Sequence, residues 1–259
     1  MSFFAPVFAE FDPLSLIFAA AAMFVAGIIK GAVGFALPTV AISGIASIMP
    51  ATVAIAGIML PALLTNFWQG LRNGPRAAVA SIVKFGWFIL GIVGIMVLVA
   101  PLVAILPADA LFLVLGFGIT VFAVIQLAGW RPSEQFAARP RAAVAAAVTA
   151  GVFGGLAGAT GPAVVFYLLA RGLKKVEQVR VQGLIFSLGL AAISLVHGAT
   201  GVLDRLTLPL SVLLVVPAIA GMTVGLFIQD RLDQETFRRA TLIVLVVAGL
   251  NLLRRGLIG

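Results

Sequence analysis

Residues 27–38 read GIIKGAVGFALP, and residues 151–162 read GVFGGLAGATGP. Three glycines and the closing proline of the first segment recur 124 positions later in the second. These residues are Gly27, Gly31, Gly34 and Pro38, matched by Gly151, Gly155, Gly158 and Pro162. Apolar segments interrupted by glycine and proline at matching positions of two halves point to a transporter's binding site. We therefore predict a membrane transporter whose substrate site is formed by these two segments.

The composition supports a membrane protein. The chain is 62% hydrophobic and 10% charged, with a mean hydropathy of +1.21, whereas about 25% of the residues in soluble domains are charged. A helix needs roughly 20 apolar residues to cross the hydrocarbon core. The length of the chain allows six to eight such crossings and leaves little sequence for a soluble domain.

Several other classes are excluded. The net charge of +8 does not indicate nucleic acid, because the basic residues lie in short loops between apolar segments, where they encode membrane orientation. The chain has no cysteine and one histidine, His197, so we expect no metal site and no cofactor. No catalytic dyad is evident, so we do not expect an enzyme. With Glu10 and Asp12 but no basic residue among the first 13, we expect no cleaved signal peptide.

The sequence also predicts two related halves, 1–130 and 142–259, joined by a cytoplasmic linker at 131–141. Beyond the broken segments, two further glycines recur at an offset of 131, Gly94 and Gly118 matching Gly225 and Gly249. Coincidence among glycine-rich membrane helices is the alternative explanation. We expect an all-α, polytopic membrane protein built from two repeats.

The basic loops favour an inverted arrangement of these repeats. Eight full crossings would divide the four basic loops between the two faces, against the positive-inside tendency. If 14–48 and 142–171 are instead re-entrant hairpins, with arms of 10–17 residues, all four loops lie in the cytoplasm. Each repeat is then a hairpin followed by three spans: 50–71, 78–100 and 109–130 in the first, and 178–198, 207–229 and 236–253 in the second. Two ordinary kinked helices are the alternative to the hairpins.

The broken segments have chemistry suited to an anion. Pro38 and Pro162 fit the first turn of a returning helix, where the missing N–H costs nothing. Unpaired N–H groups and the helix dipole at such a start favour negative charge. Two such tips meeting near the midplane would make a shared anion cradle. Close helix packing by small residues is the competing explanation for the glycines, above all for Gly31 and Gly155.

Lys30 adds a positive charge to this picture. It is the only charged residue between Asp12 and Arg72, and an ionisable residue within a membrane segment is a functional-site hypothesis by default. Snorkelling of its ammonium to the interface is the alternative. The complete predicted set of substrate-binding residues is Lys30, Gly31, Gly34, Phe35, Pro38, Asn66, Gln69, Gly155, Gly158, Thr160, Gly161, Pro162, Arg180 and Gln182. Arg180 is equally well explained as a cytoplasmic anchor.

These segments resemble the sulfite exporter TauE/SafE family. The resemblance rests on KGAVGFALP at 30–38, on GVFGGLAGATGP at 151–162 and on the helices that follow each, with Asn66 and Arg180, and it covers essentially the whole chain as two halves. It implies export of sulfite or small organosulfonates across a prokaryotic inner membrane. Many family members carry an extra glycine near Phe35 and Ala36, where this chain has none.

The predicted function is therefore export of a small oxyanion, sulfite or an organosulfonate, by a secondary transporter. Without a nucleotide-binding motif, the energy must come from gradients. The spans contain no carboxylate to carry a proton, which favours uniport or channel-like exit. The alternatives are a membrane scaffold for a partner protein and a carrier of a different small metabolite. The expected partners are the anion and the lipid bilayer, and a homodimer is one option for the oligomeric state.

Overall fold

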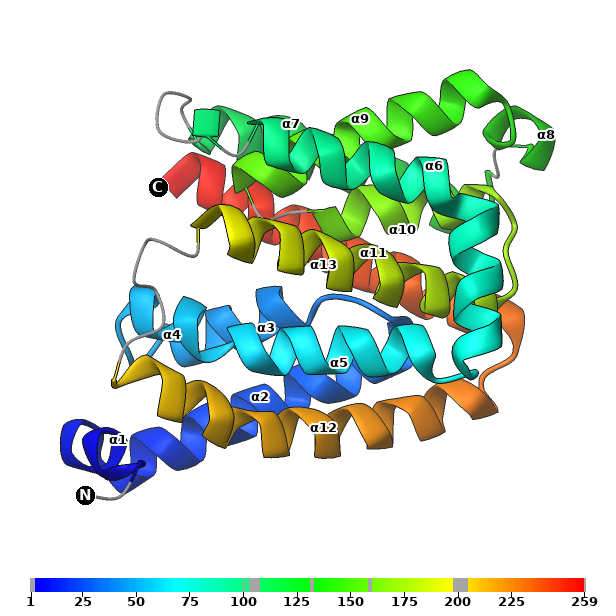
Figure 1. Cartoon of the computed structure of the whole chain (residues 1–259). Coiled ribbons are helices and arrows are strands. Elements are labelled where there is room, and N and C mark those ends of the chain that lie inside the picture. The colour runs from blue at the N-terminus through cyan, green and yellow to red at the C-terminus, as the bar shows by residue number, and fades with distance from the viewer. Residues whose placement is uncertain are drawn as a thin grey trace. The chain divides into compact units, whose positions relative to one another are not determined.

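The computed structural model describes residues 3–99, 101–102, 108–130, 133–157, 160–197 and 205–258, whose regular structure is helical (Figure 1). In chain order the helices are α1 (Ala5–Glu10), α2 (Pro13–Val33), α3 (Leu37–Ile45), α4 (Ala51–Gly57), α5 (Met59–Leu71), α6 (Pro75–Val99), α7 (Ala108–Leu127), α8 (Glu134–Ala137), α9 (Pro140–Ala157), α10 (Thr160–Ala170), α11 (Lys175–His197), α12 (Thr207–Arg231) and α13 (Gln234–Ile258). The all-α prediction is confirmed for this described part.

Five helical segments of the described chain are long and apolar enough to cross a membrane, so the protein is a multi-pass membrane protein. They are Pro13–Val33, Thr52–Leu71, Pro75–Val99, Thr207–Arg231 and Gln234–Leu257. Four of them coincide with predicted spans, and the predicted spans 109–130 and 178–198 correspond to α7 and α11.

The remaining segment, Pro13–Val33, is α2, which we expected to be a hairpin arm of 10–17 residues. It has 21 residues, because Asp12 caps its start by accepting a hydrogen bond from the backbone N–H of Ser15 at 3.0 Å and Gly34 ends it. A helix of this length reaches about 30 Å, enough to cross the hydrocarbon core. The re-entrant arrangement stays a prediction.

The chain forms two compact units that differ from the two sequence halves. The first unit contains Met1–Trp68 and His197–Leu232, and the second contains Gln69–Val196 and Asp233–Gly259. Each unit therefore takes helices from both halves. The predicted division at 131–141 describes a sequence repeat, and that repeat stays a prediction.

In the first unit, α2 packs along α12 (Figure 1). Glycines on both helices make the close approach possible. A Cβ on Gly27 would lie 2.5 Å from the carbonyl oxygen of Ala218, and a Cβ on Gly31 would lie 2.8 Å from the Cα of Gly225. Small residues that bring helix backbones together are a common basis of association within membranes.

In the second unit, α6 packs against α9, and α7 packs against α13 (Figure 1). The first of these contacts again involves glycines. A Cβ on Gly151 would lie 2.9 Å from the carbonyl oxygen of Ile92, and a Cβ on Gly155 would lie 2.6 Å from that of Met96. Beside this contact, the rings of Phe88 and Tyr167 lie 4.6 Å apart in a buried apolar cluster.

Candidate functional site

The first predicted break lies between α2 and α3. Gly34 ends α2 with a φ of 91°, and its N–H donates to the carbonyl of Lys30 at 2.7 Å. Phe35 is buried, and Ala36 precedes α3 with a φ of 75°. Pro38 is exposed and lies in the first turn of α3, as predicted. The helix break is therefore confirmed at the expected residues.

The ammonium of Lys30 does not snorkel to solvent. Lys30 is 2% exposed and Asn66 of α5 is 5% exposed, and Lys30 Nζ donates a hydrogen bond to Asn66 Oδ1. Both residues belong to the first compact unit. Among the described residues no carboxylate pairs with this ammonium. An amide oxygen accepts one of the three donors of a protonated lysine and supplies no countercharge.

The second predicted break separates α9 from α10. Gly158 lies outside the described residues. Thr160 begins α10, is buried, and directs its hydroxyl toward Met96 Sδ at 3.8 Å. Gly161 and Pro162 follow in the first turn of α10 and are half-buried. The expected position of Pro162 in a first turn is therefore confirmed.

Gly31 and Gly155 have a packing role in the structure. Each lies in one of the helix contacts described above, against α12 and α6 respectively. The alternative explanation by close packing therefore holds for both, and a direct substrate contact at either stays a prediction.

Gln69 and Gln182 lie in the second compact unit. Gln69, near the end of α5, is 1% exposed and donates from Nε2 to the carbonyl oxygen of Val179 at 2.7 Å. Next to it, a Cβ on Gly70 would lie 3.1 Å from Leu184 Cδ2, so the end of α5 contacts α11 here. Gln182 of α11 is fully buried, and neither atom of its amide has a hydrogen-bond partner among the described residues.

Arg180 is held by two neutral side chains of the same unit. Its Nε donates to Ser81 Oγ of α6 at 2.8 Å, and its Nη1 donates to Asn73 Oδ1, between α5 and α6, at 3.3 Å. These bonds tie α11 to the start of α6. Both the substrate contact of Arg180 and its alternative role as a cytoplasmic anchor stay predictions.

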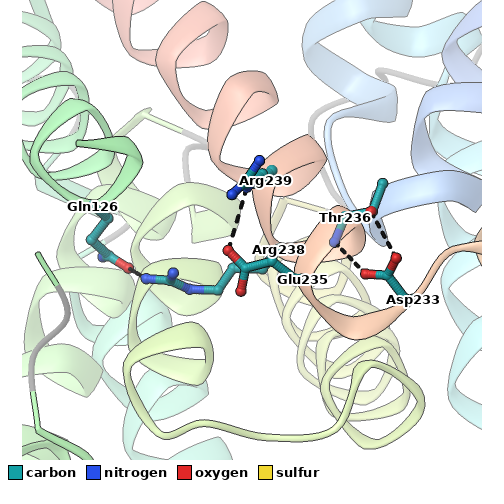
Figure 2. A network of polar contacts seen from close by, with 6 residues as sticks. All are labelled: Gln126, Asp233, Glu235, Thr236, Arg238 and Arg239. Atoms are coloured by element: carbon teal, nitrogen blue, oxygen red, sulfur yellow. Dashed lines mark hydrogen bonds and ion pairs between the residues drawn. The ribbon is translucent and has the colours of Figure 1, made fainter. Parts of the chain in front are cut away.

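A separate polar network lies at the start of α13 (Figure 2). Arg238 Nη2 donates to Gln126 Oε1 of α7 at 2.8 Å. Asp233 caps α13 by accepting from the backbone N–H of Thr236 at 2.7 Å and from its hydroxyl at 3.0 Å. These hydrogen bonds lower the pKa of the Asp233 carboxyl below its usual value. The network fixes the start of α13 and includes no residue of the predicted site.

The sequence analysis missed Gln178. This residue is fully buried on α11, and its amide has no partner among the described residues. It lies within residues 171–180, one of the four basic loops that we expected in the cytoplasm. The sequence did hold one indication of its position. Gln178 is four residues from Gln182, and residues i and i+4 share one helix face.

Comparison with known proteins identifies the family. Searches of curated proteins and of solved structures gave no match. The family model described as "Sulfite exporter TauE/SafE" matches residues 19–252, nearly the whole chain and both broken segments. The chain belongs to the sulfite exporter TauE/SafE family.

Proposed function

We propose that the chain is a secondary transporter that exports sulfite or a small organosulfonate across a prokaryotic inner membrane, and that Lys30 contacts the anion. The observation that carries this proposal is the buried ammonium of Lys30, bound to Asn66 and unpaired with any described carboxylate. The family supports a transporter of sulfite or sulfonate type.

The electrostatics of Lys30 favour an anionic ligand. Burying a charge without a counterion costs several kcal/mol. Asn66 contributes a dipole and no countercharge. An oxyanion supplies the missing charge and accepts the remaining ammonium donors, and such charge-assisted hydrogen bonds are short and strong. Substrate binding is then coupled to neutralisation of the site.

The proposed export needs no nucleotide. A negative-inside potential favours exit of a monoanion by about 2.3 kcal/mol per 100 mV. No nucleotide-binding motif occurs in the sequence. The membrane potential is therefore a sufficient energy source for net efflux when the substrate accumulates inside.

The helix contacts support the proposal of two structurally equivalent repeats. The sequence offset of 124 relates Gly27 and Gly31 of α2 to Gly151 and Gly155 of α9. The first pair packs on α12 and the second pair packs on α6. The offset of 131 relates those two partner helices, because Gly225 of α12 matches Gly94 of α6. A two-fold axis that relates the repeats would map the contact of α2 with α12 onto the contact of α9 with α6. We propose that the repeats are inverted and that each broken segment carries anion-binding residues.

Sulfite flux into proteoliposomes tests the function. We expect saturable, potential-dependent flux in the wild type. Lys30→Met, which keeps length and removes charge, should weaken the apparent affinity by about 10- to 100-fold, because a hydrogen bond to a charged group is worth about 1.5–3 kcal/mol. Lys30→Arg should retain part of the flux.

The matched control is Lys84→Met. Lys84 is a half-exposed lysine of α6 that pairs with Glu177 at 2.7 Å. Its replacement removes a positive charge that is not buried, so the affinity for sulfite should be unchanged. Equal flux in wild type and Lys30→Met would remove Lys30 from the site. No flux of any anion through folded wild-type protein would favour a scaffold or a different substrate class.

A further inference from the structure

Two glutamines of α11 are buried without any hydrogen-bond partner. Gln178 and Gln182 are both 0% exposed, and among the described residues neither Nε2 nor Oε1 of either side chain has a partner. Their i, i+4 spacing places both amides on one face of α11. Buried polar groups are nearly always paired in folded proteins, so two adjacent unpaired amides call for a ligand.

Gln178 and Gln182 belong to the second compact unit, and so does the end of α5 from Gln69 onward. The end of α5 contacts α11 at this level, where Gln69 Nε2 donates to the carbonyl of Val179. The next turn of α11 is buried on all sides from Val181 to Ile185. The unpaired amides are therefore shielded from bulk solvent.

The chemistry of the amides defines that partner. Each carboxamide offers two N–H donors and one carbonyl acceptor. A fully ionised oxyanion only accepts hydrogen bonds, so it would pair with the two Nε2 groups and leave both Oε1 atoms unpaired. A ligand that also carries an O–H or N–H group pairs with both kinds of atom.

We propose that Gln178 and Gln182 form a binding site for an oxyanion that carries its own hydrogen-bond donor. The ligand is then a monoanion that carries its own donor, such as hydrogen sulfite or a hydroxyl-substituted sulfonate. This inference rests on the proposed anion transport and specifies its substrate class. It also assigns a binding role to Gln178.

Binding of a protonated anion also bears on proton coupling. An oxyanion that crosses in its protonated form takes its own proton with it. The segments 85–108 and 181–203 contain no Asp or Glu, and none is needed, because the ligand is the proton carrier. Each transported hydrogen sulfite moves one negative charge and one proton in the same direction.

Competition between two sulfonates of equal charge tests this inference. The probes are 2-hydroxyethanesulfonate and 1-propanesulfonate, which differ by replacement of the hydroxyl with a methyl group. Each is added as an inhibitor of sulfite flux in proteoliposomes, and its stabilisation of the purified protein is measured by thermal shift. In the wild type the hydroxyl compound should bind about 10-fold or more tightly, because a site built for a hydroxyl rejects the analogue that lacks it.

The double variant Gln178→Met and Gln182→Met removes the amides while keeping side-chain length. The preference for the hydroxyl compound should fall to about 1-fold, and the melting temperature should not fall, since replacing unpaired buried polar groups by apolar ones is neutral or stabilising. The control is Gln126→Met, which removes a buried glutamine whose Oε1 is paired with Arg238, and which should keep the preference.

The possible results separate this inference from the proposed function. Anion flux with equal inhibition by the two probes would overturn the inference and leave the transport proposal standing. A hydroxyl preference that persists in the double variant would also overturn it. Absence of both flux and thermal shift would overturn the two together. A lowered melting temperature with an unchanged preference would show that the glutamines only stabilise the fold.

Discussion

The backbone N–H of Gly34 donates to the carbonyl of Lys30 at 2.7 Å, so the residue that ends α2 is bound directly to the residue that carries the buried ammonium. This bond places Lys30 in the last turn of α2, where the helix dipole favours a positive charge. The side chain then reaches Asn66 of α5. The helix break and the buried charge are therefore parts of one arrangement, and changes in the break should affect both stability and anion affinity.

The first prediction concerns two residues of that break with positive φ. Gly34 has a φ of 91° and Ala36 has a φ of 75°, a region that costs a residue with a Cβ about 1–2 kcal/mol. Gly34→Ala should therefore destabilise the protein by about 1–2 kcal/mol. Ala36→Gly should relieve the same cost, and after the loss of chain entropy of about 0.5–1 kcal/mol it should stabilise slightly.

Thermal unfolding of both variants in one detergent measures these effects. A lower melting temperature for Gly34→Ala together with an equal or higher one for Ala36→Gly is the expected pattern. Destabilisation by Ala36→Gly would show that the alanine methyl contributes packing that outweighs the backbone cost.

The second prediction is that a carboxylate at position 66 inhibits the transporter by replacing its substrate's charge. In Asn66→Asp the aspartate would lie against Lys30 Nζ as a permanent counterion. Because the ammonium is then neutralised, the anion should bind at least about 10-fold more weakly, and stability should be retained or increased. Sulfite flux and thermal shift in parallel check this.

Asn66→Leu is the matched comparison for that variant. It removes the amide and leaves the charge of Lys30 unneutralised, so it should lower stability by about 1–3 kcal/mol. If both variants lose affinity only in proportion to a loss of folded protein, the buried charge is structural and does not attract the substrate.

The sequence predicted the helix breaks well, because their signals are local. Gly34 permits the left-handed backbone and Pro38 permits a helix start without a lost hydrogen bond, and both were found where expected. Ala36 shows the limit of such reasoning, since a positive φ at alanine has no sequence signal. The absence of the family's extra glycine was noted at this place and coincides with that backbone conformation.

Long-range contacts were not predicted, and the reason is physical. The helices are apolar on nearly all sides, so no single stripe marks the partner of each. The packing of α2 on α12 and of α6 on α9, in which a helix of one half contacts a helix of the other, was therefore not visible in the hydropathy pattern. Lys30 and Asn66 were each identified, yet their direct contact across 36 residues was not. Gln178 was missed because its neighbours Lys174 and Lys175 suggested a basic cytoplasmic loop.

The third prediction separates packing glycines from tolerant ones. A Cβ on Gly31 would lie 2.8 Å from the Cα of Gly225, so Gly31→Ala must push α2 away from α12. Overpacking of this kind costs about 1–3 kcal/mol. A Cβ on Gly94 of α6 would have no described atom of a neighbouring element within 4 Å. Gly94→Ala should therefore be neutral or stabilise the protein by up to about 1 kcal/mol, because alanine is the better helix former.

Melting temperatures and anion affinities of the two glycine variants check this. If Gly31 only packs, the Gly31→Ala protein that remains folded at low temperature should bind sulfite with nearly normal affinity. A large loss of affinity with a normal melting temperature would instead support direct contact of Gly31 with substrate.

The fourth prediction concerns membrane topology and uses the absence of cysteine in the chain. Single cysteines at Ser133, Lys174 and Arg205, which are all exposed positions, can be labelled with a membrane-impermeant maleimide from either side. Between the first two positions lie the four-residue helix α8 and the longer helices α9 and α10, with 18 and 11 residues. If these helices form a re-entrant hairpin, positions 133 and 174 are labelled from the cytoplasmic side.

Position 205 follows α11, a full span in this arrangement, and should be labelled from outside. Labelling of 133 and 174 from opposite sides would show that α9 and α10 together cross the membrane, and the repeats would then be parallel, because an even number of crossings returns the chain to its starting side.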